Sequence, residues 1–481
     1  MTDFDVVEKV ESLFKETLKK YKMLDAPRRV GVATSGGSDS VALLLLFDRF
    51  KNDLGVKLVV LHFDHALRET SVRDRDFVEN LADRLGLEFV WTRKNVKSEA
   101  EQKKLSVEEA ARRSRYKWFD ELVDAGSMDC VATGHNMDDQ AETVIYRVLR
   151  GTGPDGLAAI EPIGMDGRVI RPLLGIRKQL LEQYVRARGY RFVVDETNFA
   201  VSFVRNRIRR EIVPIFEQIN PRAVESLARL AEIGFELKKW LKKKSDEMLD
   251  ACVVRGDEDT LLLDRNKILA LDEFEQICML RRALERVVGD PFGYAYQDYK
   301  KVVELIVNSD SFSWDVGRGV KVEMSTDVVR IGSEKGEINE EKILKISGVG
   351  NYEFPEIGLK VSLKLRPVKS SKDAERYEGL SALLDADRTE FPLYVRFYRK
   401  GDRFFPLGSP GEKSLADFFT GAKIPRFLRK KIPLLISSDE IVWVVGYRVS
   451  HVFRVTQKTK TALELVAELY PPPPPPPPEE S

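Results

Sequence analysis

The residues best suited to chemistry form one short string, Ser35-Gly-Gly-Ser-Asp-Ser40. Its two glycines can adopt positive φ angles, which turn backbone N–H groups toward an anion. A helix that follows such a turn offers its free N–H groups to phosphate. The apolar runs on either side predict a strand before the string and a helix that opens at Ser40. An ordinary turn uses the same residue types, but this succession favours a phosphate-binding loop.

The string lacks the Gly-Lys-Ser or Gly-Lys-Thr ending that brings a lysine to the outer phosphates of a nucleotide. Transfer of the terminal phosphate is therefore poorly supported. The string resembles the PP-loop of the ATP pyrophosphatase superfamily, which holds pyrophosphate as the leaving group while AMP passes to a substrate. The resemblance implies an adenylation with ATP as cofactor, and an ATP-binding loop made of Ser35, Gly36, Gly37, Ser38, Asp39 and Ser40.

Two further polar strings follow apolar runs. The first is Gly134-His-Asn-Met-Asp-Asp139, and its carboxylates suit Mg²⁺. We expect Asp138 or Asp139 to hold Mg²⁺ together with Asp39, although acidic residues also stabilise a helix N-terminus through its dipole. The second string, His62-Phe-Asp-His65, is expected to line the nucleotide or cytidine pocket rather than to bind a metal, because its spacing alone is weak.

Longer motifs resemble tRNA(Ile)-lysidine synthetase. They are Glu109-Ala-Ala-Arg-Arg-Ser-Arg-Tyr116, Thr133-Gly-His-Asn-Met-Asp-Asp-Gln-Ala-Glu-Thr143, Arg150-Gly-Thr-Gly-Pro-Asp-Gly-Leu157, Arg171-Pro-Leu-Leu174, Asp195-Glu-Thr-Asn198, Arg205-Asn-Arg-Ile-Arg-Arg-Glu-Ile-Val-Pro214, Arg399-Lys-Gly-Asp-Arg403, Lys413-Ser-Leu-Ala-Asp-Phe-Phe419 and Lys423-Ile-Pro-Arg426. The resemblance implies that ATP adenylates the 2-oxo group of the wobble cytidine in isoleucine tRNA with a CAU anticodon. The amine of free L-lysine then displaces AMP at carbon 2, which gives lysidine.

The same resemblance implies roles for individual residues. Asp39 and Asp138 would be catalytic and would bind Mg²⁺, and Arg112 would be catalytic near the target cytidine. His135 would bind and orient ATP or accept the proton of the lysine amine, and both roles stay open. Cationic and amide side chains suit the phosphates and exposed bases of an anticodon loop, and the expected tRNA-binding set is Arg115, Arg205, Asn206, Arg209, Lys423 and Arg426. The alternative explanation of the arginines near 205–209 is surface charge on a helix that closes the domain.

Three other classes of protein share some of these features. A PP-loop tRNA thiolase uses the same activation, but Cys130, Cys252 and Cys278 form no paired motif. A PP-loop synthetase of small metabolites has no need of the basic and aromatic residues near the C-terminus. A non-catalytic tRNA-binding protein has no need of an intact loop with Asp39 and Asp138, and a lack of ATP–pyrophosphate exchange with tRNA would favour it.

The elements that must position these residues alternate in type. Strands expected over 30–34, 57–63, 88–91 and 129–133 alternate with helices, which predicts an α/β fold with an N-terminal Rossmann-like parallel sheet. Ligands bind such sheets at the carboxyl ends of the strands. We expect a PP-loop catalytic domain over 1–220, a mainly helical tRNA domain with short strands over 221–369, a small α+β tRNA-binding domain over 370–470 and a disordered polyproline tail over 471–481.

The composition limits the partners. The 78 Lys and Arg residues nearly balance the 77 Asp and Glu residues, so a basic surface must be local. The unpaired cysteines indicate a reducing compartment, and no apolar run reaches the length of a membrane span. We expect a cytoplasmic protein with no membrane contact, and the family resemblance suggests a possible homodimer.

Overall fold

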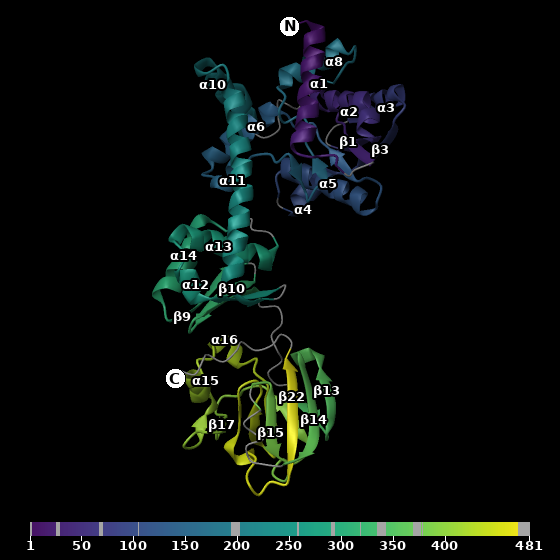
Figure 1. Ribbon diagram of the computed structural model, residues 1–481. Coiled ribbons are helices and arrows are strands. Elements are labelled where there is room, and N and C mark those ends of the chain that lie inside the picture. The colour runs from purple at the N-terminus through teal and green to yellow at the C-terminus, as the bar shows by residue number, and fades with distance from the viewer. Residues whose placement is uncertain are drawn as a thin grey trace. The chain divides into compact units, whose positions relative to one another are not determined.

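The computed structural model (Figure 1) describes residues 2–25, 29–66, 71–103, 105–193, 203–256, 259–289, 294–317, 319–333, 343–368, 377 and 379–469. The chain forms two compact units, residues 1–240 and 241–481, and the division falls within helix α11 (Ala223–Cys252). The expected boundary at residue 220 lies just before this helix. The division into three folded domains stays a prediction. The boundary near 370, the motif Asp195–Asn198 and the tail 471–481 lie outside the described residues.

The first unit is built on a six-stranded sheet in the order β3-β2-β1-β4-β6-β5. β1 pairs in parallel with both β2 and β4, while β5 runs antiparallel to β6. The carboxyl ends of β1 and β4 therefore meet at the switch point where such sheets bind ligands. The strands are β1 (Arg29–Ala33), β2 (Lys57–Asp64), β3 (Glu88–Arg93), β4 (Cys130–Ala132), β5 (Ile163–Gly164) and β6 (Val169–Ile170).

Helices cover both faces of this sheet. α1, α2, α3 and α8 enclose a core that includes Phe14, Phe47, Val78 and Tyr184. On the opposite face α5 packs Trp118 and Phe119 against the strands. The helices before α11 are α1 (Asp3–Lys20), α2 (Ser38–Leu54), α3 (Ser71–Leu85), α4 (Val96–Lys103), α5 (Val107–Asp124), α6 (Met137–Leu149), α7 (Pro154–Leu157), α8 (Lys178–Ala187), α9 (Phe203–Arg207), the π-helix η2 (Ile208–Ile212) and α10 (Val213–Ile219).

The second unit begins with a five-stranded antiparallel sheet in the order β7-β8-β11-β10-β9, which packs against α13 and α14. This sheet is larger than the short strands that we expected, because the β7–β8 strand pair extends it. Its elements are β7 (Val253–Gly256), β8 (Thr260–Asp264), α12 (Arg265–Leu269), α13 (Glu273–Val288), α14 (Tyr296–Asn308), β9 (Ser311–Gly317), β10 (Val320–Ser325) and β11 (Val328–Ser333).

The rest of the second unit has a mixed α and β structure. Two sheets, in the orders β12-β16-β19-β20-β21 and β13-β14-β22-β15, share one apolar core around Trp443. The elements are β12 (Leu344–Ile346), β13 (Gly350–Phe354), β14 (Leu359–Pro367), β15 (Ser381–Asp385), β16 (Leu393–Arg396), β17 (Arg403–Phe404), β18 (Lys413–Ser414), α15 (Leu415–Gly421), α16 (Arg426–Arg429), β19 (Leu434–Ser437), β20 (Glu440–Val444), β21 (Arg448–Val449) and β22 (Thr461–Leu469). The predicted fold class is therefore confirmed.

Within the described ranges, none of the helices combines the length and the apolar character that crossing a membrane requires.

Candidate active site

The phosphate loop joins β1 to α2 and is closed by its own serines. The Ser40 hydroxyl donates to the Gly37 carbonyl oxygen (2.9 Å) and accepts from the Ser35 N–H (3.1 Å). Helix α2 begins at Ser38, two residues earlier than predicted, because Gly37 in an extended conformation is its N-cap. Gly37 has no side chain to cap the first-turn N–H groups, so an anion can take that place.

Only one of the two loop glycines needs a positive φ. Gly36 has φ +94°, and its carbonyl oxygen accepts a hydrogen bond from the Val193 N–H (2.8 Å). Gly37 has φ −70°, which any residue can adopt, so it does not use the freedom that glycine offers. The turn needs left-handed backbone at one position only.

Three strand ends meet at this loop, as the sheet topology predicts. A β-carbon at Gly134, just after β4, would lie 3.1 Å from the Asp39 carbonyl carbon and 3.1 Å from the Ser40 nitrogen. The Nδ1 atom of buried His62, on β2, lies 2.9 Å from the Thr34 carbonyl oxygen. Because a side chain at position 134 would collide with the Asp39 and Ser40 backbone, the loop after β4 needs glycine there to approach the phosphate loop.

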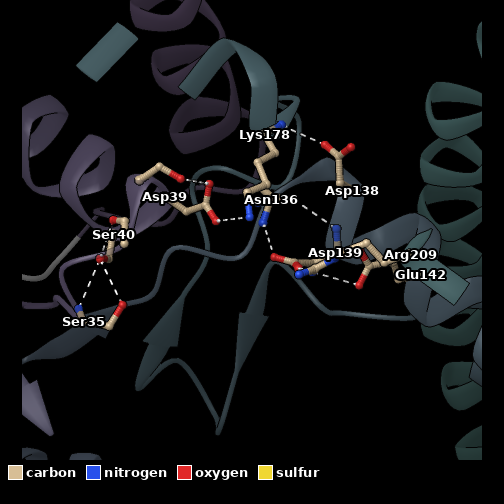
Figure 2. Close-up of polar contacts among 11 residues, drawn as sticks. Ser35, Asp39, Ser40, Asn136, Asp138, Asp139, Glu142, Lys178 and Arg209 are labelled. Carbon is tan, nitrogen blue, oxygen red and sulfur yellow. Dashed lines mark hydrogen bonds and ion pairs between the residues drawn. The ribbon is translucent and has the colours of Figure 1, made fainter. Parts of the chain in front are cut away.

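Asp39 supplies the carboxylate of the phosphate loop. Burial raises its pKa to about 6; Lys178 opposes this shift and Asp139 adds to it. Figure 2 shows the Lys178 side chain, from the start of α8, extending toward Asp39; its Nζ atom lies 4.0 Å from Asp39 Oδ2. A segment distant in sequence thus supplies the cation that the loop itself lacks.

The two acidic residues at the start of α6 have different surroundings (Figure 2). Asp138 Oδ2 accepts hydrogen bonds from the Lys178 N–H (2.8 Å) and Arg177 Nε (3.3 Å), so this carboxylate stabilises the start of α8. Asp139 forms a capping box with Asn136, and it is the acidic residue that acts on the charge of Asp39. Both carboxylates thus have contacts of their own, Asp138 with α8 and Asp139 with Asn136 and Arg209.

Arg209 lies in the π-helix η2 and contacts acidic residues of α6. Its Nε and Nη2 atoms lie 2.6 and 3.0 Å from the two Glu142 carboxylate oxygens, and Nη2 also lies 3.4 Å from Asp139 Oδ1. π-Helical turns are frequent at functional sites. The Arg209 guanidinium, which we expected to contact tRNA, thus contacts carboxylates of the first unit.

His135 lies among arginines on the other side of Gly134. Burial lowers its pKa well below the usual value, and Arg171, Arg115, Arg112 and Arg205 lower it further, so the imidazole is neutral. Its Nδ1 atom lies 2.9 Å from Thr133 Oγ1. The structure thus brings Arg112 and Arg115 of α5 together with Arg205 of α9 around the residue that follows β4.

The remaining predicted residues lie elsewhere. Asn206 lies on α9 beside Arg205, whereas Lys423 and Arg426 belong to the second unit and are exposed. Phe419 is fully buried and Phe418 packs against the same core. The tRNA-binding roles of all these residues stay predictions.

No group of three or more potential metal ligands occurs within the described ranges. Mg²⁺ in nucleotide enzymes is commonly held by one or two carboxylates together with phosphate oxygens and water. The buried Asp39 with Asp139 nearby, beside an uncapped helix start, offers that kind of donor set.

Sequence reasoning missed the roles of several residues in the site. No sequence pattern indicated a role for Lys178 or Arg177, because only the tertiary fold brings α8 to the loop. Arg171 stood in a motif that resembled the family, but the motif alone gave it no role. Its Nη2 atom donates to the Tyr116 hydroxyl (3.1 Å), which links β6 to α5.

The sequence is also similar to known proteins over most of its length. Residues 6–216 match the PP-loop domain family, and residues 393–465 match the TilS substrate C-terminal domain family. A tRNA(Ile)-lysidine synthase of Geobacter sulfurreducens is 34% identical over 433 residues, which are 89% of this chain and 90% of the relative. A second, of Caldanaerobacter subterraneus subsp. tengcongensis, is 33% identical over 465 residues, which are 96% and 97% of the two chains. A solved TilS C-terminal domain is 26% identical and covers 27% of this chain and 98% of its own, with a TM-score of 0.23.

Proposed function

Because this chain belongs to the tRNA(Ile)-lysidine synthase family of PP-loop enzymes, we propose that it joins free L-lysine to the wobble cytidine of isoleucine tRNA at the expense of ATP. The chain is a ligase of that family. The observation that carries the proposal is the contact of Gly134 with the Asp39 backbone. Through it, a loop built for pyrophosphate lies beside a group of arginines suited to RNA.

In the proposed first step, the cytidine 2-oxo oxygen attacks the α-phosphorus of ATP, and the bond to pyrophosphate breaks. The first-turn N–H groups of α2 and the ammonium of Lys178 stabilise the negative charge that develops on the leaving group. A carbonyl oxygen is a poor leaving group, and its conversion to a phosphate ester makes it a good one.

In the proposed second step, the lysine Nε attacks carbon 2 of the cytidine, the carbon–oxygen bond breaks, and AMP leaves with that oxygen while the amine loses a proton. Holding both reactants in one site makes the attack effectively unimolecular. A neutral His135 surrounded by arginines is a weak base, because gaining a proton there is unfavourable. Orientation of ATP therefore suits His135 better than removal of the lysine proton.

Mg²⁺ belongs to the proposal as well. Asp39 would hold it together with Asp138 or Asp139, which both lie at the start of α6. When bound, the ion neutralises charge on the pyrophosphate. A homodimer and a cytoplasmic location complete the proposal, and both come from the family resemblance and the cysteine usage.

The main alternative, a tRNA thiolase, receives no support from the cysteines. Cys130, Cys252 and Cys278 are all buried, and burial raises the pKa of Cys130 to about 12. A protonated, inaccessible thiol is a poor carrier of sulfur.

The test is incorporation of labelled lysine into tRNA transcripts with a CAU anticodon, in the presence of ATP and Mg²⁺. The isoleucine transcript is compared with the methionine transcript, and an Asp39→Ala protein is run in parallel. We expect label in the isoleucine transcript alone and none with the variant. Incorporation of sulfur in place of lysine, or no incorporation by a folded protein that binds ATP, would overturn the proposal.

A further inference from the structure

Three arginines of the first unit surround one tyrosine. The Tyr116 hydroxyl accepts from Arg171 Nη2 (3.1 Å), and its ring lies 5.3 Å from Arg112 Cζ and 5.8 Å from Arg115 Cζ. Burial alone would raise the pKa of Tyr116, but the three arginines together lower it. We call Arg112, Arg115, Arg171 and Tyr116 the arginine cluster.

Among the described residues, none of the three arginines of the cluster forms an ion pair with an acidic side chain. Arg171 is only 5% exposed, and its two terminal nitrogens donate to neutral oxygens, the Glu161 carbonyl (2.6 Å) and the Tyr116 hydroxyl. In the part of the chain that the structure describes, the buried Nε atoms of Arg171 and Arg115 have no hydrogen-bond partner. Burying a guanidinium without a carboxylate costs several kcal/mol, roughly, so this arrangement is adapted to an anion that arrives from outside.

The fold makes specific room for the buried arginine. A β-carbon at Gly164, on β5, would lie 2.8 Å from Arg171 Nη1, so any other residue there would displace the guanidinium. The hydrogen bond to the Tyr116 hydroxyl holds the other terminal nitrogen of Arg171, Nη2. Arg171 is therefore held in one orientation rather than lying loosely on a surface.

We propose that the arginine cluster binds a backbone phosphate of single-stranded RNA next to the target nucleotide, with Arg171 as the buried contact. The nucleotide's own phosphates already have a place at the start of α2, on the other side of Gly134. The cluster extends from buried Arg171 to exposed Arg112, so a ligand bound there continues to the surface, as a polynucleotide does. Arginine forks are well suited to phosphate oxygens. This inference rests on the proposed function in one respect only, the choice of a tRNA anticodon loop as the RNA.

The test measures binding of an anticodon stem-loop RNA, without lysine, over a range of salt concentrations. Arg171→Met should weaken binding about tenfold and lower the salt slope by about one. Replacing one phosphate beside the wobble cytidine by an uncharged methylphosphonate should weaken binding to the wild type by the same factor as the Arg171→Met substitution does. The same replacement should not weaken binding to the Arg171→Met protein any further. Arg186→Met removes an exposed arginine from α8 and serves as the matched control, with unchanged binding.

Tyr116→Phe is a second variant that keeps the core volume and removes only the acceptor of Arg171, so it gives an answer if Arg171→Met fails to fold. It should weaken RNA binding and leave ATP binding unchanged. The inference would be overturned if methylphosphonate at every position weakened RNA binding equally in the wild type and the variants. It would also be overturned if the variants lost affinity for ATP and kept their affinity for RNA, since the cluster would then hold nucleotide phosphates. Wild-type protein that binds RNA in this way but makes no lysidine would support the inference and defeat the proposed function.

Discussion

Lys178 Nζ lies 4.0 Å from Asp39 Oδ2, which places an ammonium group from α8 at a phosphate loop whose own sequence has no lysine. The backbone N–H of the same residue donates to Asp138 (2.8 Å), so the position of α8 is tied to α6. A lysine that is close to the loop without being part of it can move from the carboxylate to the pyrophosphate once ATP is bound.

The first prediction concerns this lysine. Lys178→Met should lower ATP–pyrophosphate exchange at least tenfold and weaken binding of an ATP analogue that cannot be cleaved between its α and β phosphates, because a contact with the outer phosphates is lost. AMP binding should be unchanged. Lys178→Arg should restore part of the exchange. If AMP and the analogue lose affinity equally, the role of Lys178 is only to hold α8 in place.

The second prediction concerns the charge of Asp39. Its pKa of about 6 exceeds the ordinary value of 3.8, so the native state binds more protons than the unfolded state between these two values. Stability from this group is therefore present at low pH and is lost as the pH rises through about 6. Asp39→Asn should raise the unfolding free energy of the ligand-free protein at pH 7 by about 1–3 kcal/mol while abolishing adenylation.

Urea denaturation checks this prediction at several pH values. The advantage of Asp39→Asn should shrink as the pH falls toward the ordinary carboxyl range, because the wild-type carboxylate then becomes protonated. Asp53→Asn changes an exposed residue of the same helix and should alter the unfolding free energy little at any pH. A variant that is less stable than the wild type at pH 7 would contradict the argument.

The third prediction concerns Gly134. Gly134→Ala places a methyl group 3.1 Å from the backbone of Asp39 and Ser40, which neither backbone can easily accommodate. We expect weaker ATP binding and at least tenfold slower adenylation, with a modest loss of stability. Gly411→Ala, where an added β-carbon meets nothing within 4 Å, is the control. Unchanged ATP binding in the Gly134 variant would show that the two loops can separate freely.

The fourth prediction distinguishes two roles for Arg209. Its contacts indicate that Arg209→Met leaves the buried Glu142 carboxylate without its cationic partner, which costs roughly 3–5 kcal/mol of stability. Combining it with Glu142→Gln should recover part of that loss. A stable Arg209→Met protein with a reduced salt slope for tRNA binding would instead support the direct tRNA contact that the sequence suggested.

Much of the first unit follows from local sequence, since apolar runs and turn residues predict β1, the phosphate loop and α2. The pattern of strands and helices also predicts that the loops at Ser35, His62 and His135 share one edge of the sheet. The pattern does not identify which acidic residue acts on Asp39, because Asp138 and Asp139 are adjacent in sequence and only tertiary contacts separate them. The roles of Lys178 and of the partners of Arg209 could likewise not be predicted, because their contacts join segments that are distant in the sequence.

The contact at Gly134 has a thermodynamic consequence. The residue closely approaches the phosphate loop, since an added β-carbon would meet the Asp39 and Ser40 backbone, and the arginines of the cluster act on the charge of its neighbour His135. A shift of this backbone on binding RNA would change the loop that receives ATP. Linkage then requires that ATP change the affinity for RNA by the same factor that RNA changes the affinity for ATP. The order in which the two substrates arrive would therefore affect the rate of assembly and leave the final affinity of the complex unchanged.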